Sequence, residues 1–190
     1  MAASGIIKRQ GSVMLEPRLD RVLDFAILYH RNDGELIKHC GYSVFSTSLS
    51  GNYVGNIVAS DNDLVKRIAA YVEPEIVWRI THAAEQALND IIRCTYSGYL
   101  GVDMMVYRDV HNRLMIYPAV EINLRMTMGV VAWKLARHII APDCTGVYTV
   151  AYDPANKQEH SYVAENGRLV SGIVSMLPPD CRFKIKLRVD

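Results

Sequence analysis

Hydrophobic and polar positions recur with different periods along the chain, and each period predicts one kind of element. Alternating or short apolar runs predict strands at 12–16, 22–29, 36–46, 100–107, 114–123, 147–152, 169–175 and 183–189. Apolar residues spaced by three and four positions predict helices at 60–72, 75–95 and 127–140. The segment 48–56, rich in glycine, serine and asparagine, is expected to be a loop. Turn residues at 32–34 and 109–113 favour antiparallel hairpins, so the pattern predicts an α+β fold with a mostly antiparallel sheet and two to three helices.

The helix at 75–95 carries the longest apolar stripe, and this stripe is expected to face the core. His82, Glu85, Gln86 and Asp90 fall mostly elsewhere on the helix and are expected on a solvated surface. The stripe consists of Ile76, Ile80, Ala83, Ala84, Ala87, Leu88, Ile91 and Ile92.

The segment 116–129 (IYPAVEINLRMTMG) places three polar side chains on one face of a strand. Side chains alternate between the two faces of an extended strand, so Glu121, Asn123 and Arg125 point the same way. A carboxylate and an amide oxygen suit a small hard cation such as Mg²⁺, and a guanidinium suits phosphate oxygens. The alternative interpretation is an ordinary edge strand with a polar face.

The other face of the same strand is apolar. Val120, Ile122 and Leu124 alternate with the polar residues and are expected to face a core. Pro118 cannot donate a hydrogen bond to a neighbouring strand, which predicts an edge position or a bulge.

A second acid precedes this strand along the chain. Asp103 lies on the strand at 100–107, and an antiparallel hairpin brings it beside Glu121 and Asn123 if the turn at 109–113 sets the register. Two carboxylates placed so closely repel each other unless a cation lies between them, which favours a metal site. The alternative, that each acid faces solvent without an ion, is equally compatible with the residues themselves.

Composition and charge narrow the classes of protein. The chain has 190 residues, is 50% hydrophobic and 22% charged, and carries a net charge of +1, so neither a nucleic acid nor a membrane surface is an expected partner. No apolar run has the length of a membrane span. The four cysteines are scattered without a CxxC pair and the histidines lack a metal-ligand spacing, so reduced thiols in the cytoplasm are expected and a zinc site is not.

GVDMMVY (101–107), followed after a turn by VEINLRMTMG (120–129), resembles the end of the ATP-grasp fold. There an acid on one core strand is followed on the next strand by Glu-x-Asn. The resemblance implies that Asp103, Glu121 and Asn123 hold the Mg²⁺ ions, with Mn²⁺ as an alternative, that bridge the phosphates of ATP. Arg125 matches the Glu-x-Asn-x-Arg version of the biotin carboxylase branch, which implies a catalytic role on the phosphates or the acyl-phosphate intermediate.

The front of the chain is similar to the linker strand of the same superfamily. GSVMLEP (11–17), followed by VLDFAILY (22–29), resembles the hinge segment that meets the adenine edge. The resemblance implies that Glu16 lies at the hinge and that Met14, Leu15 and Leu19 lie near the base. Met105 matches the apolar position that packs under the adenine.

The resemblance covers about residues 11–140 and implies a function. Residues 1–142 are expected to form the C-terminal, Mg-ATP-binding lobe of an ATP-grasp protein, with the hinge near 12–19, and residues 143–190 a β-rich extension packed on the same core. The implied activity is an ATP-dependent ligase that joins a carboxylate to an amine or a thiol through an acyl phosphate. Thr127 and the helix start behind it are expected either to hold an anionic substrate group or to form a simple cap.

The sequence also departs from the pattern of the superfamily. About ten residues precede the hinge, so the small lobe with its lysines and glycine-rich flap is expected to be missing. Pro17 and Gly101 stand where a polar residue and an arginine are usual. Catalysis by this chain alone is therefore not expected. The alternatives are a non-catalytic module that associates with itself or with a partner carrying the missing lobe, and a different magnesium-dependent phosphotransferase.

Overall fold

The computed structural model describes residues 7–9, 11–13, 15–93, 95–152, 159–178 and 180–190. After a helical turn at 7–9, nine strands and three longer helices follow one another in these ranges. The order is β1 (Asp20–Arg31), β2 (Lys38–Thr47), β3 (Tyr53–Val58), α2 (Asp61–Ala69), α3 (Pro74–Ile92), β4 (Gly98–Arg108), β5 (Leu114–Asn123), α4 (Met128–His138), β6 (Gly146–Tyr152), β7 (His160–Glu165), β8 (Arg168–Ser175) and β9 (Phe183–Val189).

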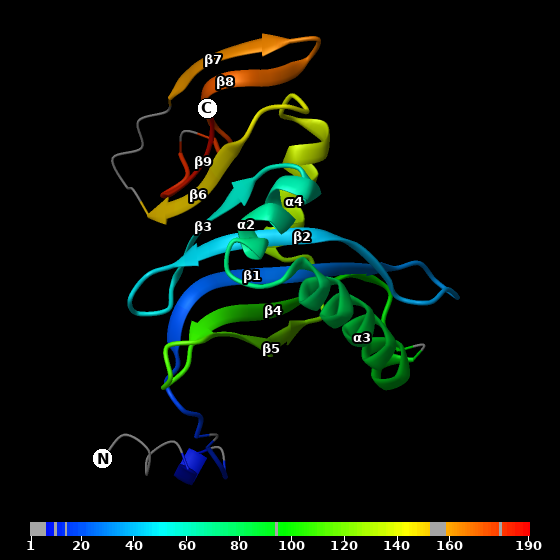
Figure 1. Cartoon of the computed structure of the whole chain (residues 1–190). Helices are drawn as coiled ribbons and strands as arrows, with labels where there is room; N and C mark the ends of the chain where they lie inside the picture. Colours follow the sequence, from blue (N-terminus) through cyan, green and yellow to red (C-terminus); the bar gives the residue numbers. More distant parts are fainter. Residues whose placement is uncertain (1–6, 10, 14, 94, 153–158, 179) are drawn as a thin grey trace.

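All nine strands belong to one sheet in the order β5-β4-β1-β2-β3-β6-β9-β8-β7 (Figure 1). Every neighbouring pair is antiparallel. The last four strands join the sheet through the pairing of β3 with β6, so the C-terminal β-rich segment continues the sheet of the first part. The α+β class and the mostly antiparallel sheet with helices, as predicted from the sequence, are confirmed.

The central strand β1 separates the two faces of the sheet. Phe25, Ile27 and Tyr29 pack into a core with residues of α2 and α3. Ala26 and Leu28, which alternate with them, pack against residues of α4. Side chains of a strand alternate between its faces, so α2 and α3 cover one face and α4 covers the other (Figure 1).

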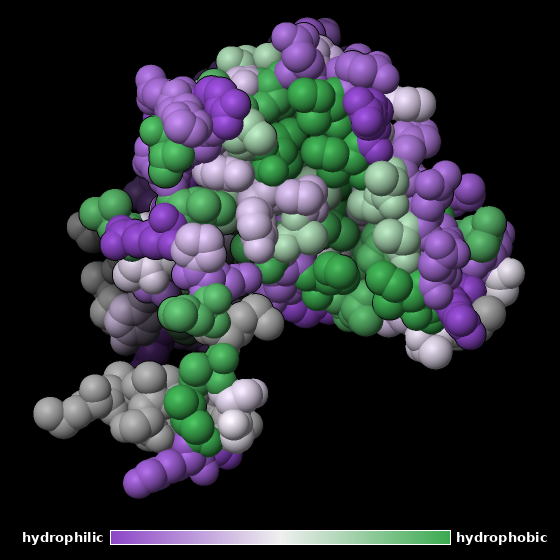
Figure 2. Space-filling view, turned by 60° about the horizontal axis from the view of Figure 1, so that its bottom comes forward, coloured by the Kyte–Doolittle hydropathy of each residue, from purple (hydrophilic) through white to green (hydrophobic). Residues whose placement is uncertain are grey.

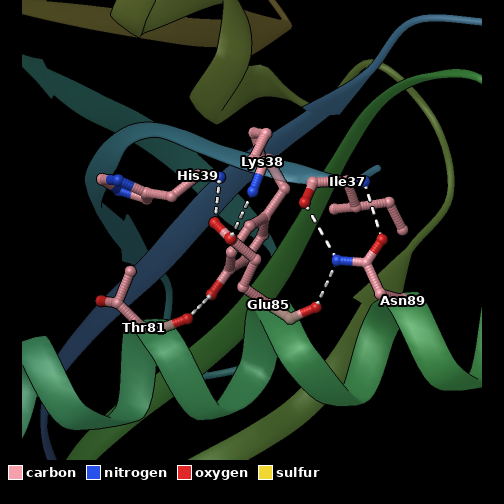
Figure 3. Close-up of polar contacts among 7 residues, drawn as sticks. Ile37, Lys38, His39, Thr81, Glu85 and Asn89 are labelled. Carbon is pink, nitrogen blue, oxygen red and sulfur yellow. Dashed lines mark hydrogen bonds and ion pairs between the residues drawn. The ribbon is translucent and has the colours of Figure 1, made fainter. Parts of the chain in front are cut away.

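The rotation of α3 about its own axis is set by hydrogen bonds to the start of β2 (Figure 3). The carboxylate of Glu85 accepts a hydrogen bond from the backbone N–H of His39 (2.7 Å), and its other oxygen lies 3.5 Å from Nζ of Lys38. The amide of Asn89 accepts from the backbone N–H of Ile37 (2.8 Å) and donates to its carbonyl (3.0 Å). These contacts hold the polar side of α3 against the sheet.

The predicted orientation of α3 is therefore only partly correct: Leu88 and Ile92 are in the core and Ile80 and Ala84 pack against it, while the rest of the predicted stripe does not. The buried positions of this helix are Val77, Thr81, Leu88 and Ile92, with Glu85 partly buried rather than solvated. Ile76, Ala83, Ala87 and Ile91, which the sequence analysis placed in the core, are exposed. Periodicity detects that a helix has an apolar side, but here the residues on both flanks of that side are apolar, so it does not fix which of them is covered.

Three strand assignments also differ from prediction. Segment 12–16 forms no strand in its described residues. The predicted loop at 48–56 is correct only for its first half, because β3 begins at Tyr53 and pairs with β2 on one side and β6 on the other. Strand β7 was missed because all six of its residues are exposed and it pairs only with β8 at the far edge.

Strand β5 is the other edge of the sheet, as Pro118 indicated. Asp103 pairs with Glu121 and Met105 with Tyr117, so three residues of β5 lie opposite the single residue 104, and Pro118 lies in this bulge. The prediction that Val120, Ile122 and Leu124 face a core is wrong, because about half of each side chain is exposed. An edge strand has a neighbour on one side only, and the helical layer does not cover this end of the sheet.

Candidate functional site

A cavity of about 960 Å³ lies on the α4 face of the sheet. Strands β1 to β5, the loop after β2 and the segment between β5 and α4 line it. Among the residues predicted for the site, Leu19, Asp103, Met105, Glu121, Asn123 and Arg125 line this cavity. The structure thus brings together six side chains that are separated by up to about a hundred positions in the sequence.

The acidic part of the cavity is built by the β4–β5 hairpin. Asp103 pairs directly with Glu121, and Gly101 pairs with Asn123. The amide nitrogen of Asn123 donates a hydrogen bond to Asp103 (3.1 Å), and its amide oxygen accepts one from Nη2 of Arg125 (2.9 Å). Asn123 is buried, whereas Glu121 and Arg125 are exposed toward the opening. The hairpin therefore aligns two carboxylates, an amide and a guanidinium along one wall.

Burial and a neighbouring negative charge make Asp103 a weaker acid than usual. Desolvation raises the pKa of Asp103 to about 6, and the charge of Glu121 adds to the increase. The charge of Arg125 and the hydrogen bond from Asn123 lower the pKa, but not enough to offset burial. A divalent cation between the two carboxylates would remove the repulsion that opposes their ionisation.

The donor set fits a magnesium ion that takes most of its ligands from a bound molecule. In the described part of the chain, no three His, Cys, Asp or Glu side chains are close enough to hold a metal by themselves. Asp103, Glu121 and the amide oxygen of Asn123 supply hard oxygen ligands, and Mg²⁺ usually keeps several waters or phosphate oxygens beside one or two carboxylates. The amide oxygen of Asn123 faces Arg125, so a cation and the guanidinium compete for it.

A third carboxylate in the cavity was missed by sequence analysis. Asp24 lies on β1 opposite Met105 of β4 and lines the cavity. It accepts a hydrogen bond from Oγ1 of Thr47 (3.0 Å) and forms an ion pair with Arg21 (3.1 Å). Burial raises its pKa, while Thr47 and Arg21 lower it. The available signal was a single acid inside the apolar run VLDFAILY, and nothing local tells such an acid from one at a surface.

A neutral polar network forms the floor of the cavity beside α4. Asn56 of β3 is only 2% exposed. Its amide donates to Oγ of Ser43 (2.6 Å) and accepts from the hydroxyl of Tyr53. Sequence analysis missed Tyr53 and Asn56 because β3 was taken for a loop, and it missed Ser43 because nothing marks this residue within the predicted strand at 36–46. The network satisfies the buried polar groups and fixes the positions of β2 and β3 at the cavity.

Of the hinge residues implied by the resemblance, one lines the cavity and the other described ones do not. Leu19 lines the cavity. Leu15 is 95% exposed and Glu16 is exposed, and neither is among the residues that line the cavity. Met14 lies outside the described residues. The roles of Met14, Leu15 and Glu16 at a nucleotide base therefore stay predictions.

Thr127 begins the helix behind the acidic wall. Its Oγ1 accepts a hydrogen bond from the backbone N–H of Val130 (3.3 Å), which is the geometry of a helix N-cap. Thr127 also lines the cavity. The structure thus supports the capping role predicted as one alternative and places the start of α4 at the cavity wall.

Two of the solved structures similar to this chain are biotin carboxylases. No family model and no curated protein matches the chain. The biotin carboxylase domain of the Hydrogenobacter thermophilus 2-oxoglutarate carboxylase, solved as a dimer with MgADP, ADP and bicarbonate, is 14% identical with a TM-score of 0.55, over 98% of this chain and 46% of its own length. Campylobacter jejuni biotin carboxylase, solved as a β-γ-ATP complex, is 12% identical with a TM-score of 0.56, over 100% of this chain and 47% of its own length.

This likeness shows the fold. The ATP-grasp fold predicted from the two strand motifs is confirmed, and the chain has the architecture of about half of each matched structure. Across the described residues, no helix combines the length and the apolar character that crossing a membrane requires.

Proposed function

We propose that this chain is the Mg-ATP-binding lobe of an ATP-dependent carboxylate ligase that works through an acyl phosphate. The observation that carries the proposal is the direct pairing of Asp103 with Glu121 beside the amide of Asn123 and the guanidinium of Arg125. The fold supports it, because matched structures with this fold were solved as complexes with MgADP and with an ATP form. The chain spans about half the length of those structures.

Each residue of the acidic wall has a definite task in this proposal. Asp103, Glu121 and Asn123 would hold Mg²⁺, which would supply positive charge to neutralise the phosphates. Before a cation binds, Asn123 positions Arg125 through its amide oxygen, so the guanidinium lies along the wall. Arg125 then binds phosphate oxygens and stabilises the negative charge that develops during transfer. Such residues act by position and charge, without a covalent bond to the substrate.

The nucleoside lies along the apolar part of the same cavity in this proposal. Met105 follows Asp103 by two positions on β4 and faces the same side, and Leu19 lines the wall next to β1. Both side chains suit one face of an adenine ring. Met14, Leu15 and Glu16 would reach the base only in a different arrangement of the segment before β1.

Direct measurement of nucleotide binding tests the proposal. Calorimetric titration of the full chain with ATP in Mg²⁺ buffer is expected to show binding that a chelator removes. The double variant Glu121→Ala, Asn123→Ala is expected to lose it, since one carboxylate is left for the cation. The control Glu73→Ala, Asn62→Ala removes the same residue types from exposed positions and is expected to bind as the parent does. Unchanged affinity in the first variant would refute the proposed site.

A further inference from the structure

The outer side of α3 presents an apolar stripe whose members are exposed in the described structure, except Ile80, which is half-buried against the core. Its members recur every three or four residues, so they lie in one row along the helix. Ile76 is 40% exposed and Ile91 is 74% exposed, and the alanines between them are exposed as well. The stripe consists of Ile76, Ile80, Ala83, Ala87 and Ile91.

The hydrogen bonds of the opposite side hold this stripe outward. Glu85 and Asn89 are tied to β2, as Figure 3 shows, and the hydroxyl of the buried Tyr29 donates to the carbonyl of Thr81 (3.0 Å). Turning α3 to bury the stripe would break all of these contacts and leave buried polar groups without partners, which is costly. The exposure of the stripe is therefore a fixed property of the fold.

The neighbouring sheet edge extends the apolar surface. Ile122 pairs with Val102, a member of the core under α3, so Ile122 lies on the same side of the sheet as the helix. It is 48% exposed because β5 has no further neighbour. Figure 2, in which this edge comes forward, shows hydrophobic residues gathered over the face with hydrophilic residues at its borders. Contiguous patches of this kind usually mark an interaction site.

Two charged side chains border the stripe and determine which binding partner is electrostatically complementary to it. Arg79 and Asp90 are both exposed and lie eleven positions apart on the flank next to Ala83, which corresponds to about 16 Å along the helix. Among the described residues, no ion pair involves either side chain. A cation near one end and an anion near the other match a second helix of the same sequence that runs in the opposite direction.

We propose that this stripe binds a second copy of the chain, with the two α3 helices antiparallel across a two-fold axis near Ala83. An isologous contact of this kind repeats each pair twice. The small side chains of Ala83 and Ala87 let the helices approach at the centre, and the larger ones fill the ends. The pairs that meet are Ile76 with Ile91, Ile80 with Ala87, and Arg79 with Asp90.

The first experiment measures self-association of the full chain by sedimentation velocity over a range of concentrations. A dimer is expected with a dissociation constant on the order of 1–100 μM, because one helix and a strand edge form a small interface. Ala83→Glu places two carboxylates at the two-fold axis and is expected to give a monomer throughout. His82→Glu adds the same charge one position along but on another side of α3, and it is expected to dimerise as the parent does.

The second experiment tests which partner the stripe accepts. Arg79→Asp and Asp90→Arg, each alone, oppose like charges at both ends and are expected to weaken the dimer by about tenfold or more. An equimolar mixture of these two variants is expected to form a heterodimer, since each then meets a complementary chain. The double swap in one chain is expected to restore self-association. Only an antiparallel contact between two copies predicts recovery in both cases.

Clear results overturn the proposal. A parent chain that stays monomeric at concentrations well above that range excludes a second copy as the occupant. Dimers that persist in Ala83→Glu, with its fold confirmed by circular dichroism, place the interface elsewhere. The charge variants failing to recover in the mixture exclude the antiparallel arrangement. The nucleotide site is independent of this surface, so Glu121→Ala with Asn123→Ala is expected to dimerise like the parent.

Discussion

The two faces of the sheet at β1 bury different kinds of side chain. Under α2 and α3, Phe25, Ile27 and Tyr29 belong to a core cluster of apolar residues. On the α4 face, the alternate position Asp24 of the same strand lines the cavity with Asp103 of the next strand. Alternation along β1 thus directs Phe25, Ile27 and Tyr29 to the core under α2 and α3, and on the other face it places Asp24 in the cavity next to the packed Ala26 and Leu28. The following predictions test this division of roles.

Truncation in the helix-covered core is expected to have the largest effect on stability. Phe25 is 1% exposed, and Phe25→Ala is expected to lower the free energy of unfolding by about 3–5 kcal/mol, because it removes buried surface and leaves a cavity. Denaturant unfolding followed by circular dichroism measures this. A loss below about 1 kcal/mol would mean that the core repacks and that the helix-covered face is not the main source of stability.

Loss of the polar attachment of α3 is expected to have the second largest effect on stability. Asn89→Ala removes the two hydrogen bonds to the backbone of Ile37 and leaves those buried groups without partners. The expected loss is about 1–3 kcal/mol in the free energy of unfolding. Gln86→Ala, at an exposed position one turn away, is the matched control and should stay within about 0.5 kcal/mol of the parent. Equal effects in the two variants would contradict the anchoring role of Asn89.

Removing the charge of Asp103 on the cavity face is expected to raise the free energy of unfolding, whereas the two preceding substitutions lower it. The pKa of Asp103 is raised to about 6 in the folded chain, so between its ordinary value and pH 6 the folded chain binds more protons than the unfolded chain. Stability from this group is therefore present at low pH and falls as pH rises toward 6. Asp103→Asn is expected to raise the free energy of unfolding at pH 7 by about 1 kcal/mol, a value discounted because the carboxyl is partly exposed to solvent.

Thermal unfolding with and without Mg²⁺ and ATP checks this interpretation of Asp103. The ligand is expected to raise the midpoint of the parent chain and to leave Asp103→Asn nearly unchanged, since the variant lacks one carboxylate ligand. Asp143→Asn, at an exposed position, is the control for loss of one negative charge. A variant that is less stable than the parent at pH 7 would show that Asp103 has a structural role.

The smallest effect on stability is expected at the cavity entrance. Arg125 is exposed, so Arg125→Ala should change the free energy of unfolding by less than about 0.5 kcal/mol. Its affinity for Mg-ATP should still fall by about tenfold, because a charge-assisted contact to phosphate is lost. Arg67→Ala, exposed on α2, should change neither quantity. An unchanged affinity in Arg125→Ala would remove this arginine from the proposed site.

Local patterns predicted much of the site because the relevant contacts are between neighbours in the sequence. Strand alternation put Glu121, Asn123 and Arg125 on one face, and the short connection between β4 and β5 brought Asp103 opposite Glu121. Pro118 indicated the edge and the bulge, since its missing N–H acts wherever the strand lies. These features depend on backbone geometry over about twenty residues, which the sequence states directly.

Local patterns could not predict the cavity residues that lie on strands far apart in the sequence. Asp24 joined the cavity because β1 pairs with β4, and Asn56 joined it because β3 pairs with β2 and β6. Both pairings connect segments far apart in the chain. The residues next to Asp24 or Asn56 in the sequence do not indicate whether the side chain lines a cavity or lies on the outer surface.

The sequence by itself thus determined most of the strands, the β4–β5 hairpin and the alignment of Asp103, Glu121 and Asn123 along one wall of the candidate site. Only the tertiary structure decided what α3 exposes. Apolar residues cover more than half the circumference of this helix, so periodicity permits several rotations, and the hydrogen bonds of Glu85 and Asn89 to β2 select one of them. The physical reason is that the hydrophobic period describes only the spacing of apolar residues along the helix. The rotation of the helix about its axis is set by directional hydrogen bonds to another element.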